Sequence, residues 1–91
     1  MLLSSFYTFS TGRASLVNED WRFPTVNGTM EYAPSSGEKN FFDPKTGRYF
    51  VFYASSKLDE SDYTIDPISN KLTLKFDPID NSSITVYYIG G

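Results

Sequence analysis

The side chains in this chain best able to do chemistry are acidic ones that lie close together. They are Asp59, Glu60, Asp62 and Asp66. Clustered carboxylates can bind calcium, but the calcium loop needs a glycine at its sixth position and a glutamate at its twelfth, and this spacing supplies neither. We therefore interpret the cluster as a solvated loop with turn-capping aspartates, and we predict no metal site.

Catalytic chemistry has little support elsewhere in the sequence. The chain contains no histidine and no cysteine, which removes the commonest general base, the commonest metal ligand and any disulfide. Its serines lie in no Gly-x-Ser-x-Gly motif, and no glycine loop for phosphate is present. Paired carboxylates for glycoside hydrolysis are conceivable, but no second signature accompanies them. We predict no catalytic residues, no cofactor and no enzyme activity.

The charge pattern also limits the partners. The net charge is −3 and the basic residues form no stripe, so nucleic acid is not expected as a partner. Met1-Leu2-Leu3 is followed at once by serines, which is too short for a signal-peptide core, and no span is long enough to cross a membrane. We expect a soluble chain that begins at Met1 and has no membrane partner.

The aromatic content points to β-structure. The chain has 8 Phe, 7 Tyr and 1 Trp, and such residues favour pleated sheets. Alternation and turn residues predict strands over 5–10, 29–33, 38–42, 48–54, 62–65, 71–76 and 83–89. The sequences DPKTGR and DPISNK share the layout of a four-residue hairpin loop with a left-handed residue, Gly47 or Asn70, near its end. They predict that 38–42 pairs with 48–54 and that 62–65 pairs with 71–76.

The expected fold class is therefore all-β. We predict a small antiparallel β-sandwich or barrel of about six or seven strands with an irregular N-terminal segment. Residues 1–91 form a single domain, because the chain is short. Within it, 1–28 is expected to be a partly irregular arm, since 12–28 shows no clean period, and 29–91 is expected to be the sheet core.

Two of the predicted strands are apolar on both faces. In 48–54, Phe50 and Phe52 lie opposite a second apolar set, and in 83–89 Tyr87 and Ile89 do the same. A domain this small has little material with which to cover both faces, so part of this surface is predicted to be an interface. We take Phe50, Phe52, Tyr87 and Ile89 as candidate contact residues.

Trp21 and Phe23 are the remaining candidate interface residues, as anchors of the arm. With Arg22 they could instead form a stacking platform for a sugar ring. We favour packing of Trp21 against the sheet, because a lone tryptophan more often packs than binds.

The second half of the chain resembles a β-sandwich module of structural proteins in tailed bacteriophages. The resemblance covers roughly residues 50–91 and depends on an aromatic strand, an Asp-Tyr-Thr step, two alternating strands and a proline loop between them. The stretches that carry it are Phe50-Val51-Phe52-Tyr53, Leu58, Asp62-Tyr63-Thr64-Ile65, Leu72-Thr73-Leu74, Pro78 and Ile84-Thr85-Val86-Tyr87-Tyr88. The chain departs from the pattern at Ala54-Ser55-Ser56, where the module usually has an Asn-Gly turn.

The resemblance implies a virion structural protein without catalytic residues. The expected form is a capsid decoration or cement protein, homo-oligomeric, bound to other virion proteins and assembled in the host cytoplasm. Three alternatives stay open. They are a head–tail connector or neck component, a receptor-binding tail module that recognises glycans through Trp21 and tyrosines, and a bacterial carbohydrate-binding module.

Overall fold

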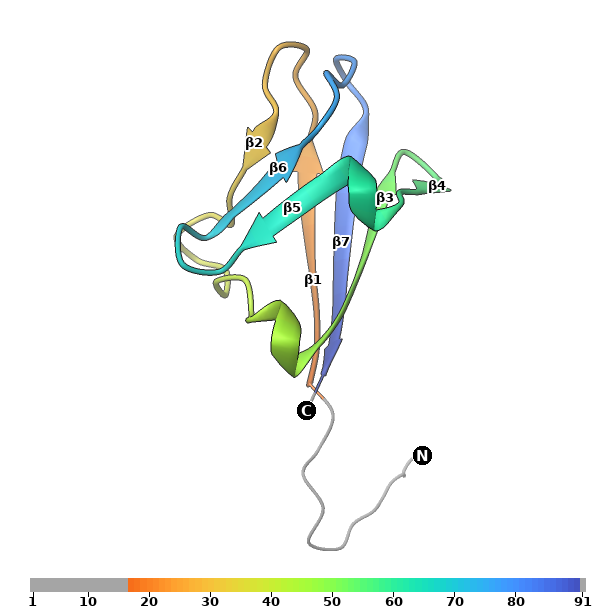
Figure 1. Ribbon diagram of the computed structural model, residues 1–91. Helices are drawn as coiled ribbons and strands as arrows, with labels where there is room; N and C mark the ends of the chain where they lie inside the picture. The colour runs from red at the N-terminus through yellow and green to blue at the C-terminus, as the bar shows by residue number, and fades with distance from the viewer. Residues whose placement is uncertain (1–16, 91) are drawn as a thin grey trace, which may run out of the picture.

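A computed structural model describes residues 17–90 of the chain, and in this range the protein is all-β, as predicted. Seven strands form two antiparallel sheets that face one another like the layers of a sandwich (Figure 1). The strands are β1 (Val17–Pro24), β2 (Glu31–Tyr32), β3 (Gly47–Tyr53), β4 (Ser56–Lys57), β5 (Tyr63–Asp66), β6 (Lys71–Leu74) and β7 (Ser83–Gly90). Two short 3-10 turns, η1 (Pro44–Thr46) and η2 (Glu60–Asp62), precede β3 and β5.

The larger sheet has the strand order β1-β7-β3-β4. The last strand, β7, lies at its centre and pairs with β1 over the whole length of both strands. On its other side, β7 pairs with β3 from Gly47 opposite Gly90 to Tyr53 opposite Ile84. The predicted strands 48–54 and 83–89 are therefore present and adjacent, and their pairing with each other was not predicted from the sequence.

The smaller sheet has the order β2-β6-β5 and contains the predicted hairpin. Tyr63 pairs with Leu74 and Asp66 with Lys71, so the DPISNK loop closes as expected. Asn70 has a φ of 58°, the left-handed conformation that asparagine tolerates better than most residues.

The core lies between the two sheets. From β7, Ile84, Val86 and Tyr88 point inward, and from β6, Leu72 and Leu74 meet them; all are buried. The remaining buried hydrophobic side chains are Trp21, Phe23, Tyr32, Phe41 and Val51. The alternation predicted for the strands 71–76 and 83–89 is confirmed, because the buried residues fall on every second position.

The prediction of an arm over 1–28 is wrong for residues 17–24, which form β1. The sequence VNEDWRFP did not indicate a strand, because only two inward positions of β1 are strongly apolar and residues 18–20 are of types that are depleted in strands. Pairing with the central strand β7 overrides that local preference. The strand predicted over 5–10 lies outside the described residues.

The predicted hairpin between 38–42 and 48–54 is also wrong. Residues 38–42 form no strand, and DPKTG builds η1, whose first turn is capped by Asp43 through the Lys45 N–H (2.9 Å). The neighbouring rings of Phe41 and Phe42 both pack inward, against Trp21 and Tyr88 at centroid distances of 4.9 and 4.5 Å. A strand would send two adjacent side chains to opposite faces, so this double contact excludes regular pairing here.

Gly47 is extended, with a φ of −173°, and does not take the left-handed conformation predicted for it. Its need for a glycine is steric. A Cβ there would lie 2.5 Å from the carbonyl oxygen of Ile89 and 2.7 Å from the Tyr88 ring. The close approach of β3 to β7 at this end of the sheet therefore depends on the missing side chain.

Candidate interaction surface

The face of the four-stranded sheet that points away from the core carries an apolar patch. Its members are Phe50 and Phe52 of β3 and Tyr87 and Ile89 of β7, and we call it the outer aromatic face. Phe50 pairs directly with Tyr87, and Ile89 lies one inter-strand pair further along the same face. Neighbouring strands thus bring together side chains that are separated by more than thirty residues in the sequence.

The patch is packed within itself but uncovered by the described residues. The rings of Phe52 and Tyr87 meet edge to face, with centroids 5.8 Å apart. The Lys57 ammonium lies 6.0 Å from the centroid of the Phe50 ring, within reach of a weak cation–π interaction. Tyr87 is 38% and Ile89 46% exposed, which is high for large hydrophobic side chains in a sheet.

A shallow depression of about 490 Å³ lies over this patch. All four members of the outer aromatic face line it, together with Asn18 and Asp20 of β1. In register, Asp20 lies beside Tyr87 at one margin and Arg48 beside Ile89 at the other. An apolar centre with charged margins is the arrangement found in protein interfaces, where a polar rim surrounds a buried core.

The structure separates Trp21 and Phe23 from the other candidate residues. Trp21 is 1% and Phe23 7% exposed, so both belong to the core; this burial contradicts their assignment as candidate interface residues and the alternative of a sugar platform. The packing interpretation of Trp21 is confirmed. Its indole N–H donates to the Lys39 carbonyl oxygen (2.8 Å), and its ring meets that of Phe41 edge to face.

The acidic cluster serves local structure. The Asp59 backbone N–H donates to Asp62 in the cap of η2, and the Ile68 N–H donates to Asp66 at the start of the β5–β6 turn. That hydrogen bond and those from Ser69 hold the pKa of Asp66 below its usual value. Within residues 17–90, no three metal-ligating side chains come together.

The other shifted groups are also explained by packing and turns. Burial raises the pKa of Tyr49 to about 12, and its hydroxyl donates to the Phe42 carbonyl oxygen (2.7 Å). Burial also raises the pKa of Tyr63, and hydrogen bonds from Ser35 lower that of Glu38. Of these groups, Tyr49 and Tyr63 line one groove between β3 and β5, and Asp66 and Glu38 lie outside it; each shift has a local cause in burial or in a turn hydrogen bond.

Sequence reasoning missed the margins of the outer aromatic face. Arg48 could have been placed there, since it shares the period of Phe50 and Phe52. Asp20 and Asn18 could not, because they reach the patch only through the pairing of β1 with β7.

Comparison with known proteins gives no match to a family model, to a curated protein or to a solved structure. Within the described part of the chain, no helix is long and apolar enough to cross a membrane. The fold defines the chain as a small β-sandwich-like domain, and the phage resemblance stays a prediction from its sequence.

Proposed function

We propose that this chain is a structural protein of a tailed-phage virion, a capsid decoration or cement protein that docks through its outer aromatic face. The partners are further copies of the chain and other virion proteins, with assembly in the host cytoplasm. Its contribution is mechanical, because buried apolar surface joins neighbouring subunits and many repeated contacts add together.

The observation that carries this proposal is the uncovered apolar patch on a complete sheet. The core is already filled by the inward faces of β3 and β7, so the outward residues Phe50, Phe52 and Tyr87 are not needed to close it. Aromatic side chains are enriched in interfaces. A partner that covers the patch removes its apolar surface from water, and this burial stabilises the complex.

The resemblance to phage modules supplies the biological setting. The stretches that carry it contribute to β3, β5, β6 and β7, so the sequence pattern traces strands of both sheets. A head–tail connector or neck component would use the same surface in another part of the particle, and remains the alternative. A glycan platform built on Trp21 is excluded by the burial of that side chain.

Self-association of the purified full-length chain tests the proposal. We expect sedimentation velocity over a wide concentration range to show a discrete oligomer. In Tyr87→Lys the oligomer should dissociate while the circular dichroism spectrum stays that of the folded protein. With 38% of the side chain exposed, Tyr87 would bury about 75 Å² more on association, or about 2 kcal/mol per copy.

The matched control is Ile68→Lys. Ile68 is the most exposed large hydrophobic residue described, at 95%, but it lies in the β5–β6 turn and not on the outer aromatic face. The same new charge should leave the oligomer intact there. A wild-type chain that stays monomeric at millimolar concentration would contradict the proposal, and so would an unfolded Tyr87→Lys variant, because Tyr87 would then belong to the core.

A further inference from the structure

The larger sheet has a long edge at β1. In the order β1-β7-β3-β4, β1 has β7 on one side and no strand among the described residues on the other (Figure 1). It is 8 residues long, whereas the other strands at sheet edges, β2, β4 and β5, have 2, 2 and 4 residues. A long edge strand is a template for pairing with another strand, and natural proteins usually keep such edges short.

The hydrogen-bonding groups at this edge belong to the even-numbered residues of β1. The Thr25 N–H donates to the Ser82 carbonyl oxygen (3.0 Å) in continuation of the β1–β7 register, so Thr25 directs its backbone groups toward β7. Because this direction alternates along an antiparallel ladder, Asn18, Asp20 and Arg22 direct theirs to the other side. Within residues 17–90, no backbone hydrogen bond joins these outward groups to another segment.

The side chains along the edge are self-complementary in charge. Asp20 and Arg22 lie on the same face of the sheet, and their side chains are 51% and 71% exposed. Their contact within the chain is long, at 3.8 Å, so both groups can pair with another molecule. When two copies of β1 lie antiparallel with Asp20 of one opposite Arg22 of the other, symmetry produces the same pair a second time.

Charge also selects this register over its neighbours. A shift of two residues is the smallest that keeps the outward backbone groups paired. In one direction it places Asp20 opposite Asp20, and in the other it places Arg22 opposite Arg22. Like charges directly opposite one another destabilise a strand pair, whereas opposite charges stabilise it. The register with two Asp20–Arg22 pairs is therefore favoured over both.

We propose that two copies of this chain pair along β1 in this register. The two-fold axis passes between the two Trp21 residues, and each indole stays in the core of its own copy. The ladder ends at Pro24, which has a carbonyl oxygen for the Asn18 N–H of the other copy but no N–H of its own. The product is one continuous sheet with four strands from each copy and both outer aromatic faces on the same side.

A second copy fits this edge better than an unrelated strand. The outward side chains Asn18, Asp20 and Arg22 are polar, so an added strand buries little apolar surface here, and charge must select the partner. The partner has to present a base opposite Asp20 and an acid opposite Arg22, which β1 itself does. Exposed ion pairs contribute little, so we expect a weak dimer that forms at high protein concentration. This contact is separate from the outer aromatic face and does not depend on the proposed virion role.

Hydrogen exchange at the Asp20 and Arg22 amides of the full-length chain, followed by NMR, tests the proposal. In the dimer both amides donate to the other copy, so they should exchange more slowly as the protein concentration rises. From about 10 µM to about 1 mM the exchange should slow by up to about tenfold, because above the dissociation constant the monomer fraction falls with the square root of the concentration. The Val86 amide, in the central strand β7, should stay protected throughout and reports that the fold persists.

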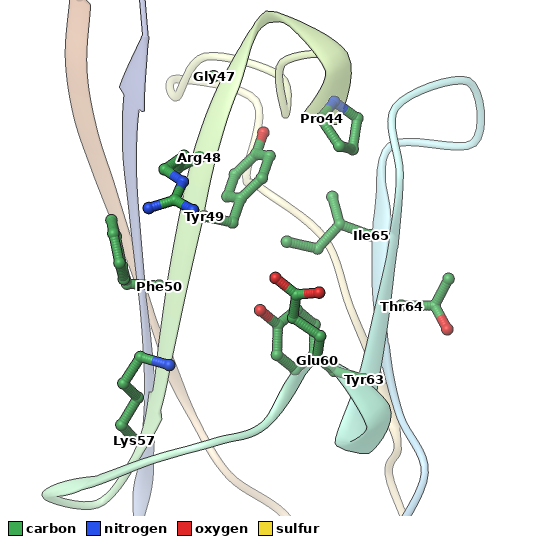
Figure 2. A pocket seen from close by; sticks show the side chains of 10 residues that line it. All are labelled: Pro44, Gly47, Arg48, Tyr49, Phe50, Lys57, Glu60, Tyr63, Thr64 and Ile65. Atoms are coloured by element: carbon green, nitrogen blue, oxygen red, sulfur yellow. The ribbon is translucent and has the colours of Figure 1, made fainter.

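Reversing the charges identifies the partner. Asp20→Arg opposes two arginines and Arg22→Asp opposes two aspartates, so each variant alone should lose the concentration-dependent protection. An equimolar mixture of the two variants restores opposite charges at both positions, and the protection should return. The matched control is Arg48→Asp, the same reversal on β3, on the side of the sheet that Arg48 shares with Phe50 (Figure 2), and it should keep the protection.

Three results would overturn the proposal. They are fast exchange of both amides at every concentration, slow exchange that does not depend on concentration, which would show that the edge is covered within one chain, and a mixture that stays unprotected. Failure of the proposed function is distinguishable from these results. Association through the outer aromatic face alone raises the mass in sedimentation velocity without slowing these two amides, and a chain that lacks that association can still form the dimer along β1.

Discussion

Replacing Trp21 with phenylalanine tests the assignment of this residue to the core. The indole is 1% exposed, and its N–H donates to the Lys39 carbonyl oxygen at 2.8 Å. Its ring lies 4.9 Å from that of Phe41 and 6.2 Å from that of Tyr49, centroid to centroid. The substitution keeps an aromatic ring but removes the hydrogen bond and part of the volume.

The expected loss of stability follows from these contacts. A phenyl ring leaves about 40 Å³ empty, which costs about 1 kcal/mol at ~24 cal/mol per Å³. The Lys39 carbonyl loses its partner, and since this part of the chain is accessible to water, we take the low end of the usual range, about 1 kcal/mol. The free energy of unfolding should therefore fall by about 2 kcal/mol, which lowers the melting temperature by about 10 °C in a domain of this size.

Urea unfolding followed by far-ultraviolet circular dichroism measures this change without the tryptophan signal. The matched control is the neighbouring residue in β1, with Arg22→Gln. Arg22 points outward, its side chain is 71% exposed, and its ion pair with Asp20 is long at 3.8 Å, so its replacement should change stability by less than about 0.5 kcal/mol. If Trp21→Phe is equally mild but weakens self-association, Trp21 is an interface residue and its placement in the core is refuted.

Three further predictions concern single positions. Gly47→Ala should lower the free energy of unfolding by about 1–3 kcal/mol in urea titrations, because the new Cβ would lie 2.5 Å from a β7 carbonyl oxygen, whereas Gly37→Ala has nothing within 4 Å and should be neutral. The pKa of Tyr49 is raised to about 12 in the folded state, whereas the ordinary pKa of tyrosine is about 10. The stability that this shift contributes is therefore complete below about pH 10 and is lost as the pH rises toward about 12. In Tyr49→Phe the urea midpoint should depend less on pH over this range. Asn70 has a φ of 58° and accepts from the Phe41 N–H (2.8 Å), so Asn70→Ala should destabilise more than Asn70→Gly in thermal unfolding; equal losses would show that backbone strain plays no part.

Local sequence signals correctly predicted the hairpin whose two strands are neighbours in the sequence. The β5–β6 hairpin has a clear alternation in Leu72 and Leu74 and a turn whose Asp66 and Asn70 each have a definite role, so neighbouring residues contain all the information needed. The two apolar faces of β3 and β7 were predicted for the same reason, since the period of two belongs to each strand alone.

The elements that were not predicted from the sequence are those whose conformation depends on contacts with distant residues. β1 contains Asn18-Glu19-Asp20, residue types that are depleted in strands, and it becomes a strand because β7 offers a full ladder of partners more than fifty residues away. Phe41 and Phe42 are likewise of a residue type that favours strands, but both rings pack in the interior, against Trp21 and Tyr88 respectively. The margins of the outer aromatic face follow from the same pairing and could not be predicted before it.

The pairing of β1 with β7 has a consequence for how the chain reaches this structure. β1 cannot join the sheet before β7 is present, because β7 lies between β1 and β3, and β7 ends at Gly90. During synthesis the four-stranded sheet cannot assemble until residues 83–90 have left the ribosome, and a sheet built from such distant partners forms slowly. The outer aromatic face needs that sheet, so it forms only after β7 has been synthesised, and under the proposed function a nascent chain that lacks β7 has no assembled surface with which to bind neighbouring subunits.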